Sequence, residues 1–346
     1  MDRGGREGAG RAFAWMFPAG IAGWLVSFAV LGEASAMRAL LVSFLYFAPL
    51  AAAMVTWPAV VQVSNGRWAG EYERLALAGI GFAPFALAAL GVLWIAADWW
   101  TPWAGRTFPQ GHWLSVNAVF ARNMAAQTVF WALAWRRQRR AQMERGKKAA
   151  TTLLVAYGAA FSLLGYDLVM GLNPAWHSSL FGAYFFVSGM YAGVAAWALL
   201  AAMSPDPDPE RLHDLGKLVV TFCLITTYCL YSQLLPIWYE NLPFETAFAV
   251  KRLNFEPGLA VGAALLAAAY LGPVLFLLTA KAKRNPKILG SVCGVILAAL
   301  WVERWWLAGL ELPGNPLFGL VDASAGLMLL GLFGVGIARR LRMGAP

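Results

Sequence analysis

The chain has 346 residues, of which 60% are hydrophobic and 13% charged, and its formal net charge is +9. A soluble domain of this size cannot hide that much apolar surface, so the composition excludes a soluble globular protein and favours an integral membrane protein. The basic residues gather in short segments between apolar runs, where they indicate membrane topology and contact with the lipid bilayer rather than binding of nucleic acid.

Ten apolar runs are long enough to cross a bilayer. Lipid requires each segment to pair its own backbone polar groups, and the runs are too long for the strands of a membrane barrel. We therefore predict an all-α integral membrane protein with ten transmembrane helices in a single polytopic domain, residues 1–346. The predicted helices cover approximately 12–32, 38–63, 75–97, 113–135, 150–170, 178–202, 215–238, 258–280, 288–308 and 318–338.

The first run has some features of a signal peptide. It follows Arg3, Arg6 and Arg11, and "ASA" at 34–36 resembles a cleavage site. However, the run spans about 20 residues, which is longer than the apolar part of a signal peptide. We therefore expect a retained membrane helix.

The distribution of basic residues predicts the topology. With the N-terminus in the cytoplasm and ten spans, the inner segments carry 21 Lys or Arg, the outer segments carry five, and Arg122 lies inside a span. Because cytoplasmic loops are enriched in Lys and Arg, this asymmetry places both termini in the cytoplasm. The run "RRQRRAQMERGKK" (136–148) is then a cytoplasmic loop, with DNA binding as a remote alternative.

Charged residues interrupt two of the runs, 113–135 and 150–170. Arg122 lies near the middle of the run 113–135, where a charge costs about 2.5–3.5 kcal/mol. It is either a structural arginine paired with a carboxylate or backbone carbonyls, or it controls a proton or ligand path. In "YDLVMGLNPAWH" (166–177), a short turn is expected to bring Asp167 close to His177. The two side chains are either a proton-transfer pair or a salt bridge that closes a helical hairpin.

The run 215–238 carries a polar stripe. His213, Lys217 and Thr221 follow i, i+4 spacing, and Tyr228 continues roughly the same line. Such a stripe is either a hydrogen-bonded proton path or a contact between helices. Asp214 also suits the positive end of the helix dipole.

Two later runs hold further charges. Glu303 and Arg304 are neighbours on one predicted helix, so they should point in different directions and need separate partners. Asp322 opens the last run. Asp167, His177, Glu303 and Asp322 are expected at a similar depth on the outer side.

The sequence offers no ligand set for a redox metal. Cys223, Cys229 and Cys293 lie inside apolar runs without a CxxC or CxxCH motif, and the three histidines lack the spacing of a bis-histidine haem site. We expect neither a disulfide framework nor a metal bound by this chain alone, so any redox metal belongs to a partner. Phosphate-loop, nucleophile-elbow and zinc motifs are also absent from the sequence.

Several segments resemble a known family. From about residue 75 to 310, they resemble the second quinone-binding-type membrane subunit of alternative complex III, which is similar to the polysulfide-reductase (NrfD-like) membrane proteins. The segments are "WLSVNAVFARNMAA", "YDLVMGLNPAWHSSLFGAYFFVSG", "HDLGKL", "YSQLLPIWYENLPFET" and "AKRNPKIL". The resemblance implies ten helices in the bacterial inner membrane, arranged as two four-helix bundles plus two peripheral helices.

The resemblance also implies a function. The family's complex oxidises a quinol, menaquinol or ubiquinol, and passes electrons to a cytochrome c or an oxidase. The implied partners are an iron–sulfur protein subunit, a multihaem cytochrome c subunit and a second NrfD-like membrane subunit, with haem c and iron–sulfur clusters held by those partners. The alternatives are a passive membrane anchor for redox subunits and a secondary transporter.

The resemblance implies proton-path roles for Arg122, Asp167, His213, Asp214 and Lys217, which occupy polar positions of the family. On the ninth helix, family members carry His and Asp where this sequence has Leu300 and Glu303, so the carboxylate is kept and the histidine is not. Asp167, His177 and Trp176 are the quinone-binding candidates. The complete proton-path candidates are Asp167, His177, Arg122, His213, Asp214, Lys217, Thr221, Tyr228, Glu303 and Asp322.

Overall fold

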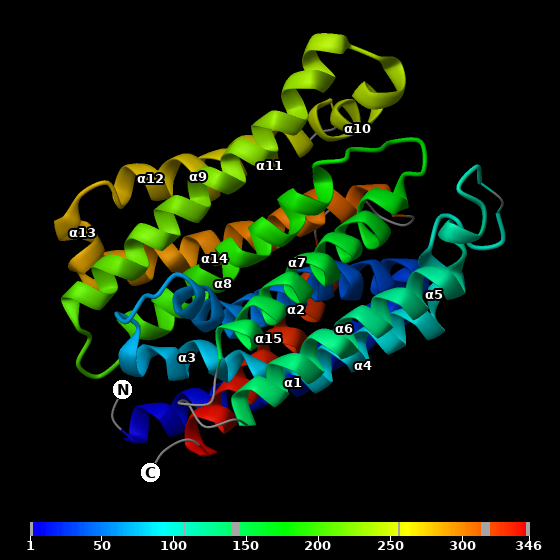
Figure 1. Ribbon diagram of the computed structural model, residues 1–346. Helices are drawn as coiled ribbons and strands as arrows, with labels where there is room; N and C mark the ends of the chain where they lie inside the picture. Colours follow the sequence, from blue (N-terminus) through cyan, green and yellow to red (C-terminus); the bar gives the residue numbers. More distant parts are fainter. Residues whose placement is uncertain (1–2, 107, 140–145, 255–256, 313–318, 344–346) are drawn as a thin grey trace.

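The computed structural model describes residues 3–106, 108–139, 146–254, 257–312 and 319–343 (Figure 1). All regular structure in these ranges is helical, and the long helices lie roughly alongside one another in one bundle-like body (Figure 1). Residues 140–145 of the basic run, predicted as a cytoplasmic loop, lie outside the described ranges.

Nine helical segments of the described residues are long and apolar enough to cross a membrane, which confirms the prediction of an all-α membrane protein. Two segments are composite, because a 3₁₀ turn or a π-helical turn interrupts them. The nine are α1 (Arg3–Leu31), α2 (Glu33–Val63), α3–η2–α4 (Glu73–Leu77, Ala78–Phe82 and Ala83–Ile95), α7 (Lys147–Leu168), α8 (Phe181–Ala202), α9 (Pro209–Glu240), α11–η6–α12 (Gly258–Leu265, Leu266–Leu271 and Gly272–Phe276), α14 (Pro286–Ala308) and α15 (Leu320–Met343).

A tenth long helix, α6 (Val116–Arg139), packs against α4 and α7. Its 24 residues correspond to about 36 Å, enough to cross a bilayer, although polar side chains lower its hydropathy. The ends of the chain support ten crossings. A β carbon on Gly10 would lie 2.8 Å from Nη2 of Arg342, so the start of α1 lies beside the end of α15, and an even number of crossings is required. We call this end of the helices the terminal face and the opposite end the distal face.

The ten segments form two four-helix bundles and one peripheral pair, as the family resemblance implies. Bundle 1 consists of α2, α3–η2–α4, α6 and α7, and bundle 2 of α8, α9, α11–η6–α12 and α14. Helices α1 and α15 pack mainly on each other, and α15 also contacts α2 and η2. Helix α2 joins all three units, because it contacts α7, α8, α14 and α15 (Figure 1).

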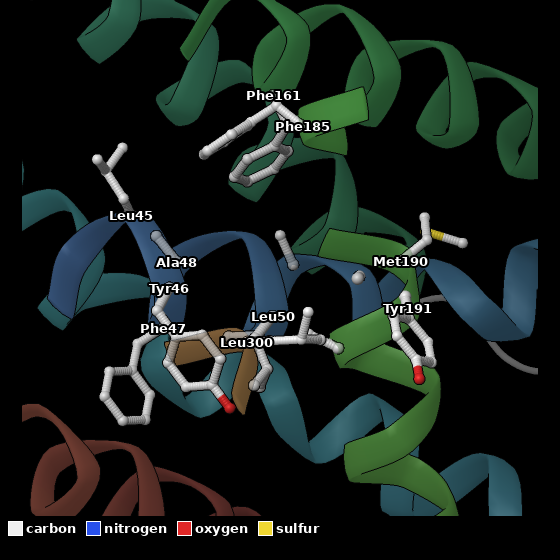
Figure 2. Close-up of a cluster of buried hydrophobic side chains, with 14 of the residues drawn as sticks. Leu45, Tyr46, Phe47, Ala48, Leu50, Phe161, Phe185, Met190, Tyr191 and Leu300 are labelled. Atoms are coloured by element: carbon white, nitrogen blue, oxygen red, sulfur yellow. The ribbon is translucent and has the colours of Figure 1, made fainter. Parts of the chain in front are cut away.

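Helix α2 is the core of the molecule, and every residue from Ser35 to Ala59 is buried. Small side chains allow neighbouring helices to approach closely. A β carbon on Gly193 of α8 would lie only 2.5 Å from Cβ of Ala53 on α2. Figure 2 shows part of this core, which includes Leu45, Tyr46, Phe47 and Leu50 of α2, Tyr191 of α8 and Leu300 of α14.

Polar capping residues determine several helix ends that differ from those predicted from hydropathy. The predicted start of the seventh helix at 215 is six residues late, because Asp208 caps α9 by accepting hydrogen bonds from the backbone N–H groups of Glu210 and Arg211. Asn285 caps α14 in the same way. Asn241, with φ 48°, ends α9 in the left-handed conformation.

Helix α10 (Pro243–Leu253) lies at the distal face and is fixed by the fully buried Arg252. Its guanidinium donates to the backbone oxygens of Phe248, Trp306 and Leu307 and to the carboxylate of Glu311 at 2.9 Å. Burial lowers the pKa of Arg252 to about 10, and Glu311 opposes this shift, so the side chain is charged at neutral pH.

Candidate functional site

Three buried carboxylates lie toward the distal face, on three different helices. Asp167 is near the end of α7, Glu303 is near the end of α14, and Asp322 is near the start of α15. Each is at most 2% exposed. A charge buried in this way is costly in a membrane unless it has partners, and each of the three has its own set.

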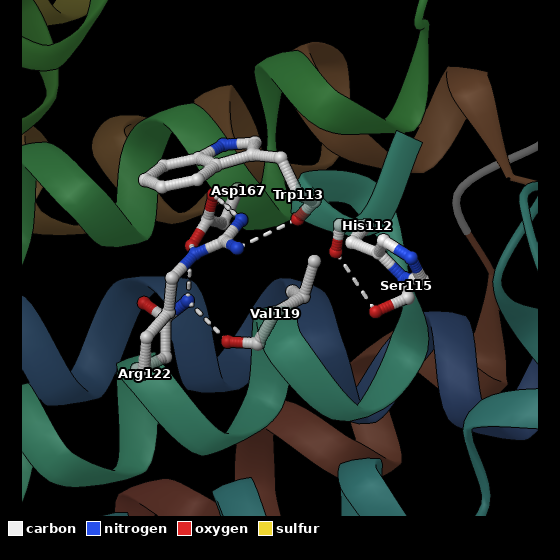
Figure 3. Close-up of polar contacts among 7 residues, drawn as sticks. His112, Trp113, Ser115, Val119, Arg122 and Asp167 are labelled. Atoms are coloured by element: carbon white, nitrogen blue, oxygen red, sulfur yellow. Dashed lines mark hydrogen bonds and ion pairs between the residues drawn. The ribbon is translucent and has the colours of Figure 1, made fainter. Parts of the chain in front are cut away.

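Asp167 is held by Arg122 and Asn123 of α6 (Figure 3). Nε of Arg122 donates to Oδ2 at 2.7 Å and Nη2 donates to Oδ1 at 2.5 Å, a bidentate pair that links bundle helices α6 and α7. The third nitrogen, Nη1, donates to the backbone oxygen of Trp113 at 2.6 Å, and the guanidinium lies 4.0 Å from the centre of the Trp113 ring. Arg122 therefore has a carboxylate, a carbonyl and an aromatic face as partners.

The structure does not pair Asp167 with His177, although the sequence suggested that the short turn brings them together. Asp167 is turned toward α6, while His177 is exposed at the surface of the distal face. Trp176, the third quinone-binding candidate, is buried and stacks on Phe248 of α10, with ring centres 3.8 Å apart. The three candidates thus have three different environments.

The buried side of α6 continues the polar surface below Asp167. Asn123 and Gln127 lie one turn apart and are at most 1% exposed. Both polar atoms of Gln127, and Oδ1 of Asn123, have no hydrogen-bond partner among the described residues. Such groups are costly in an apolar interior, and in native proteins they are usually bonded to protein or to ordered water.

Glu303 has a different kind of environment, in the middle of bundle 2. The hydroxyls of Tyr184 (α8) and Tyr270 (η6) both donate to Oε1 of Glu303, and the two hydroxyl oxygens are 3.4 Å apart. Oε2 has no hydrogen-bond partner among the described residues and lies 3.6 Å from Nη1 of Arg304. Nη2 of Arg304 donates to Oγ of Ser188 at 2.5 Å.

The expectation that Glu303 and Arg304 point in different directions is only partly right. Their hydrogen-bond partners are separate, as expected, because adjacent helical residues leave the helix about 100° apart. The long arginine side chain nevertheless brings its guanidinium back to within ion-pair distance of the carboxylate.

A π-helical turn contributes backbone oxygens to the same region. In η6, the oxygen of Ala269 accepts a hydrogen bond from the hydroxyl of Tyr191 at 2.7 Å, and that of Tyr270 accepts one from Sγ of Cys223 at 3.1 Å. Tyr184, Ser188 and Tyr191 occupy one face of α8, at i, i+4 and i+7. This line of hydrogen-bonding groups extends the Glu303 site toward the terminal face, and π-helical turns are frequent at functional sites.

Asp322 forms an ion pair with Arg38, whose Nη2 lies 3.2 Å from Oδ2. The backbone N–H of Gly319 also donates to Oδ2, at 3.0 Å. Arg38 is 1% exposed inside α2, so both members of this ion pair lie within helices. Arg304 is also buried inside a helix, α14, where the sequence predicted it.

The polar stripe of α9 lies on the outside of bundle 2. Lys217 is 56% exposed, Thr221 is exposed, and Tyr228 is 68% exposed. Asp214 pairs with Lys217 at 2.6 Å on the surface, while Nδ1 of His213 is buried without a hydrogen-bond partner among the described residues. The buried face of α9 instead carries Cys223, Thr226, Cys229 and Gln233.

The sequence missed several members of these sites. Tyr184 and Tyr270 lie in apolar runs, where tyrosine is an ordinary packing or interface residue, so no sequence signal distinguishes them. Gln127 and Arg38 did carry a signal, because a strongly polar side chain within an apolar run must find a protein environment.

Among the described residues, no group of three or more His, Cys, Asp or Glu side chains is placed to hold a metal ion, and the three cysteines are free and buried. No protein-family model matches the chain, and no curated protein matches it. The fold and these sites define an all-α multi-pass membrane protein with buried ionisable groups in both bundles.

Proposed function

We propose that this chain is a proton-handling membrane subunit of a quinol:electron-acceptor oxidoreductase of the alternative complex III type. In this proposal, the metals that carry electrons belong to partner subunits and the terminal face lies in the cytoplasm. The family resemblance of the sequence supplies the class of complex, and the geometry of bundle 2 supplies the proton-handling role.

The observation that carries the proposal is the environment of Glu303. Asp167 and Asp322 each have an arginine guanidinium in direct hydrogen-bond contact. Glu303 instead accepts hydrogen bonds from two tyrosine hydroxyls at one oxygen. Its other oxygen lies 3.6 Å from Arg304 and has no hydrogen-bond partner among the described residues. Among these three carboxylates, Glu303 is therefore the one without a direct arginine hydrogen bond, and the hydroxyls that contact it can both donate and accept hydrogen bonds, as a proton-transfer chain requires.

The neighbouring groups support proton transfer over part of the membrane. Ser188, Tyr191 and Cys223 continue the hydrogen-bonding groups from Glu303 toward the terminal face. At the terminal face, the aliphatic stem of Lys283 lies over Gly216 of α9, and its amine donates to the backbone oxygens of Leu277 and Leu278. We assign Glu303 as the distal proton acceptor and this basic end of bundle 2 as the entrance.

The outward stripe of α9 is assigned to a different role. Its exposed Lys217, Thr221 and Tyr228 cannot be part of a path inside bundle 2. Hydroxyl and basic side chains on a membrane helix are suited to contact with another protein. We therefore propose that α9 faces a partner subunit in the complex.

The test is the Glu303→Gln variant of the purified complex, with quinol oxidation and proton release measured on the same sample. Gln keeps the size of the side chain and can still accept hydrogen bonds from the two tyrosines, but it cannot bind and release a proton near neutral pH. We expect the number of protons released per quinol to fall while the complex remains assembled. The double variant Arg38→Gln/Asp322→Asn is the matched control, since it neutralises a buried ion pair outside bundle 2.

Unchanged proton release in Glu303→Gln would favour the second candidate, a passive membrane anchor for redox subunits. The exposed face of α9 supports that candidate, because a docking surface for partners is all that an anchor needs. A proton yield that falls equally in the control would show a general loss of structure, and would remove the specific role of Glu303.

A further inference from the structure

A long apolar groove separates α15 from bundle 2. It has a volume of about 950 Å³, at the upper end of the range for small-molecule sites, and α2 forms its floor. Helices α8 and α14 form the opposite wall. The wall on α15 is one continuous helix face, which includes Gly326, Leu330, Gly334, Ile337, Leu341 and Arg342.

Helices α14 and α15 are in contact near the distal end of the groove. Trp301 of α14 packs directly on Gly326, where a β carbon would lie 2.3 Å from Cζ2 of the indole. At the other end, Met203 and Arg342 line a mouth at the terminal face. Between Gly326 and Arg342, α15 rises about 24 Å, so a long extended chain fits along the groove and enters from the leaflet at the terminal face.

The mouth is cationic, while the walls are apolar. Arg342 is the charged residue among those that line the groove, and its guanidinium lies over Gly10, where a β carbon would be 2.8 Å away. No carboxylate of the described residues forms an ion pair with Arg342. Arg340 lies in the same last turn of α15, and Arg339 directly precedes it. Basic side chains at a membrane surface attract anionic lipid headgroups.

We propose that this groove binds an anionic phospholipid from the leaflet at the terminal face, with its acyl chains along α15 and its phosphate at Arg342. The positive charge of Arg342 at the mouth favours an anionic phospholipid over a neutral isoprenoid. An isoprenoid would contact the apolar walls but would not form an ionic contact with the arginine. The lipid fills the space between α15 and bundle 2, since the main contacts of α15 are with α1, α2 and η2. The site is independent of the proton-handling role proposed above.

The experiment is quantification of the phospholipid that remains with the protein after purification in mild detergent, by lipid extraction and native mass spectrometry. Arg342→Ala should reduce the retained anionic phospholipid about fivefold, the effect of one basic residue at an anionic surface. Its matched control is Arg339→Ala, which removes an exposed charge from the same helical turn without altering the groove lining.

A second pair of variants tests the walls. Ala298 of α14 lines the groove and is exposed, so Ala298→Phe should fill the space and expel the lipid without disturbing the core. Val295→Phe places the same ring on an exposed face of α14 that does not line the groove. Equal losses in Arg342→Ala and Arg339→Ala, full retention in Ala298→Phe, or recovery of a neutral isoprenoid as the bound molecule would each overturn the proposal.

Discussion

Arg38 of α2 and Asp322 of α15 form an ion pair between residues that lie 284 positions apart, and both side chains are 1% exposed. This contact joins the first fully buried helix of the chain to its last helix. Nε and Nη1 of Arg38 and Oδ1 of Asp322 have no hydrogen-bond partner among the described residues, so each charge depends on the other for its compensation.

The Arg38–Asp322 pair should therefore show strong non-additivity. Arg38→Met or Asp322→Leu alone leaves one unpaired buried charge, and we expect each to lower the free energy of unfolding by about 3–5 kcal/mol. The double variant removes both charges and should recover most of that loss. Unfolding of the purified protein in detergent measures the cycle, and strictly additive losses would contradict the interpretation.

The bidentate geometry at Asp167 predicts that lysine cannot replace Arg122. Lysine keeps the positive charge but loses the fork that contacts both carboxylate oxygens and the oxygen of Trp113. We expect Arg122→Lys to lower the free energy of unfolding by about 1–2 kcal/mol. Arg136→Lys on the same helix, at an exposed position, is the control and should have no effect. Equal stability of the two variants would show that charge alone matters at this position.

The close approach of α2 and α8 depends on Gly193. A β carbon there meets Cβ of Ala53 at 2.5 Å and its backbone carbon at 3.0 Å, so neither helix can yield cheaply. We expect Gly193→Ala to lower the thermal stability by the equivalent of about 1–3 kcal/mol. Gly158→Ala on α7, where no heavy atom lies within 4 Å of the added carbon, should be neutral or stabilise the protein by about 0.5–1 kcal/mol. A larger loss of stability in Gly158→Ala than in Gly193→Ala would contradict this packing.

Arg252 should control the mobility of α10. Arg252→Ala removes hydrogen bonds to three backbone oxygens and to Glu311, so amide hydrogen exchange in 243–253 should become about 10–100-fold faster. Lys251→Ala, which breaks a half-exposed ion pair with the same Glu311, should change the exchange by less than about fivefold. Similar exchange in the two variants would show that α10 is held by its apolar contacts alone.

Hydropathy was sufficient to predict the membrane class and the spans, because apolar runs and basic loops are local properties of the sequence. The prediction is least accurate where a cap decides the helix end, as at Asp208, since one side chain there outweighs the average hydropathy of its neighbours. Hydropathy also predicted the helix α6 despite its polar residues, because the apolar run around Arg122 is long enough to span a membrane.

The partners of the buried charged residues were harder to predict from the sequence. Proximity along the chain suggested Asp167 with His177, but the orientation of the last turn of α7 directs Asp167 to α6. In the i, i+4 stripe that begins at His213, Lys217 and Thr221 are exposed but His213 is half-buried. Periodicity cannot say whether a helix face points into the bundle or away from it. Contacts such as Tyr184 with Glu303 depend on the packing of distant helices, which sequence spacing does not encode.

The burial of α2 has a consequence for biogenesis. Helix α2 is translated before α7, α8, α14 and α15, which all contribute to its surroundings, and Asp322 of α15 follows Arg38 by 284 residues. During that interval, Arg38 has no Asp322 to compensate its charge. We therefore expect α2 to remain shielded from lipid during membrane insertion until α15 has been inserted.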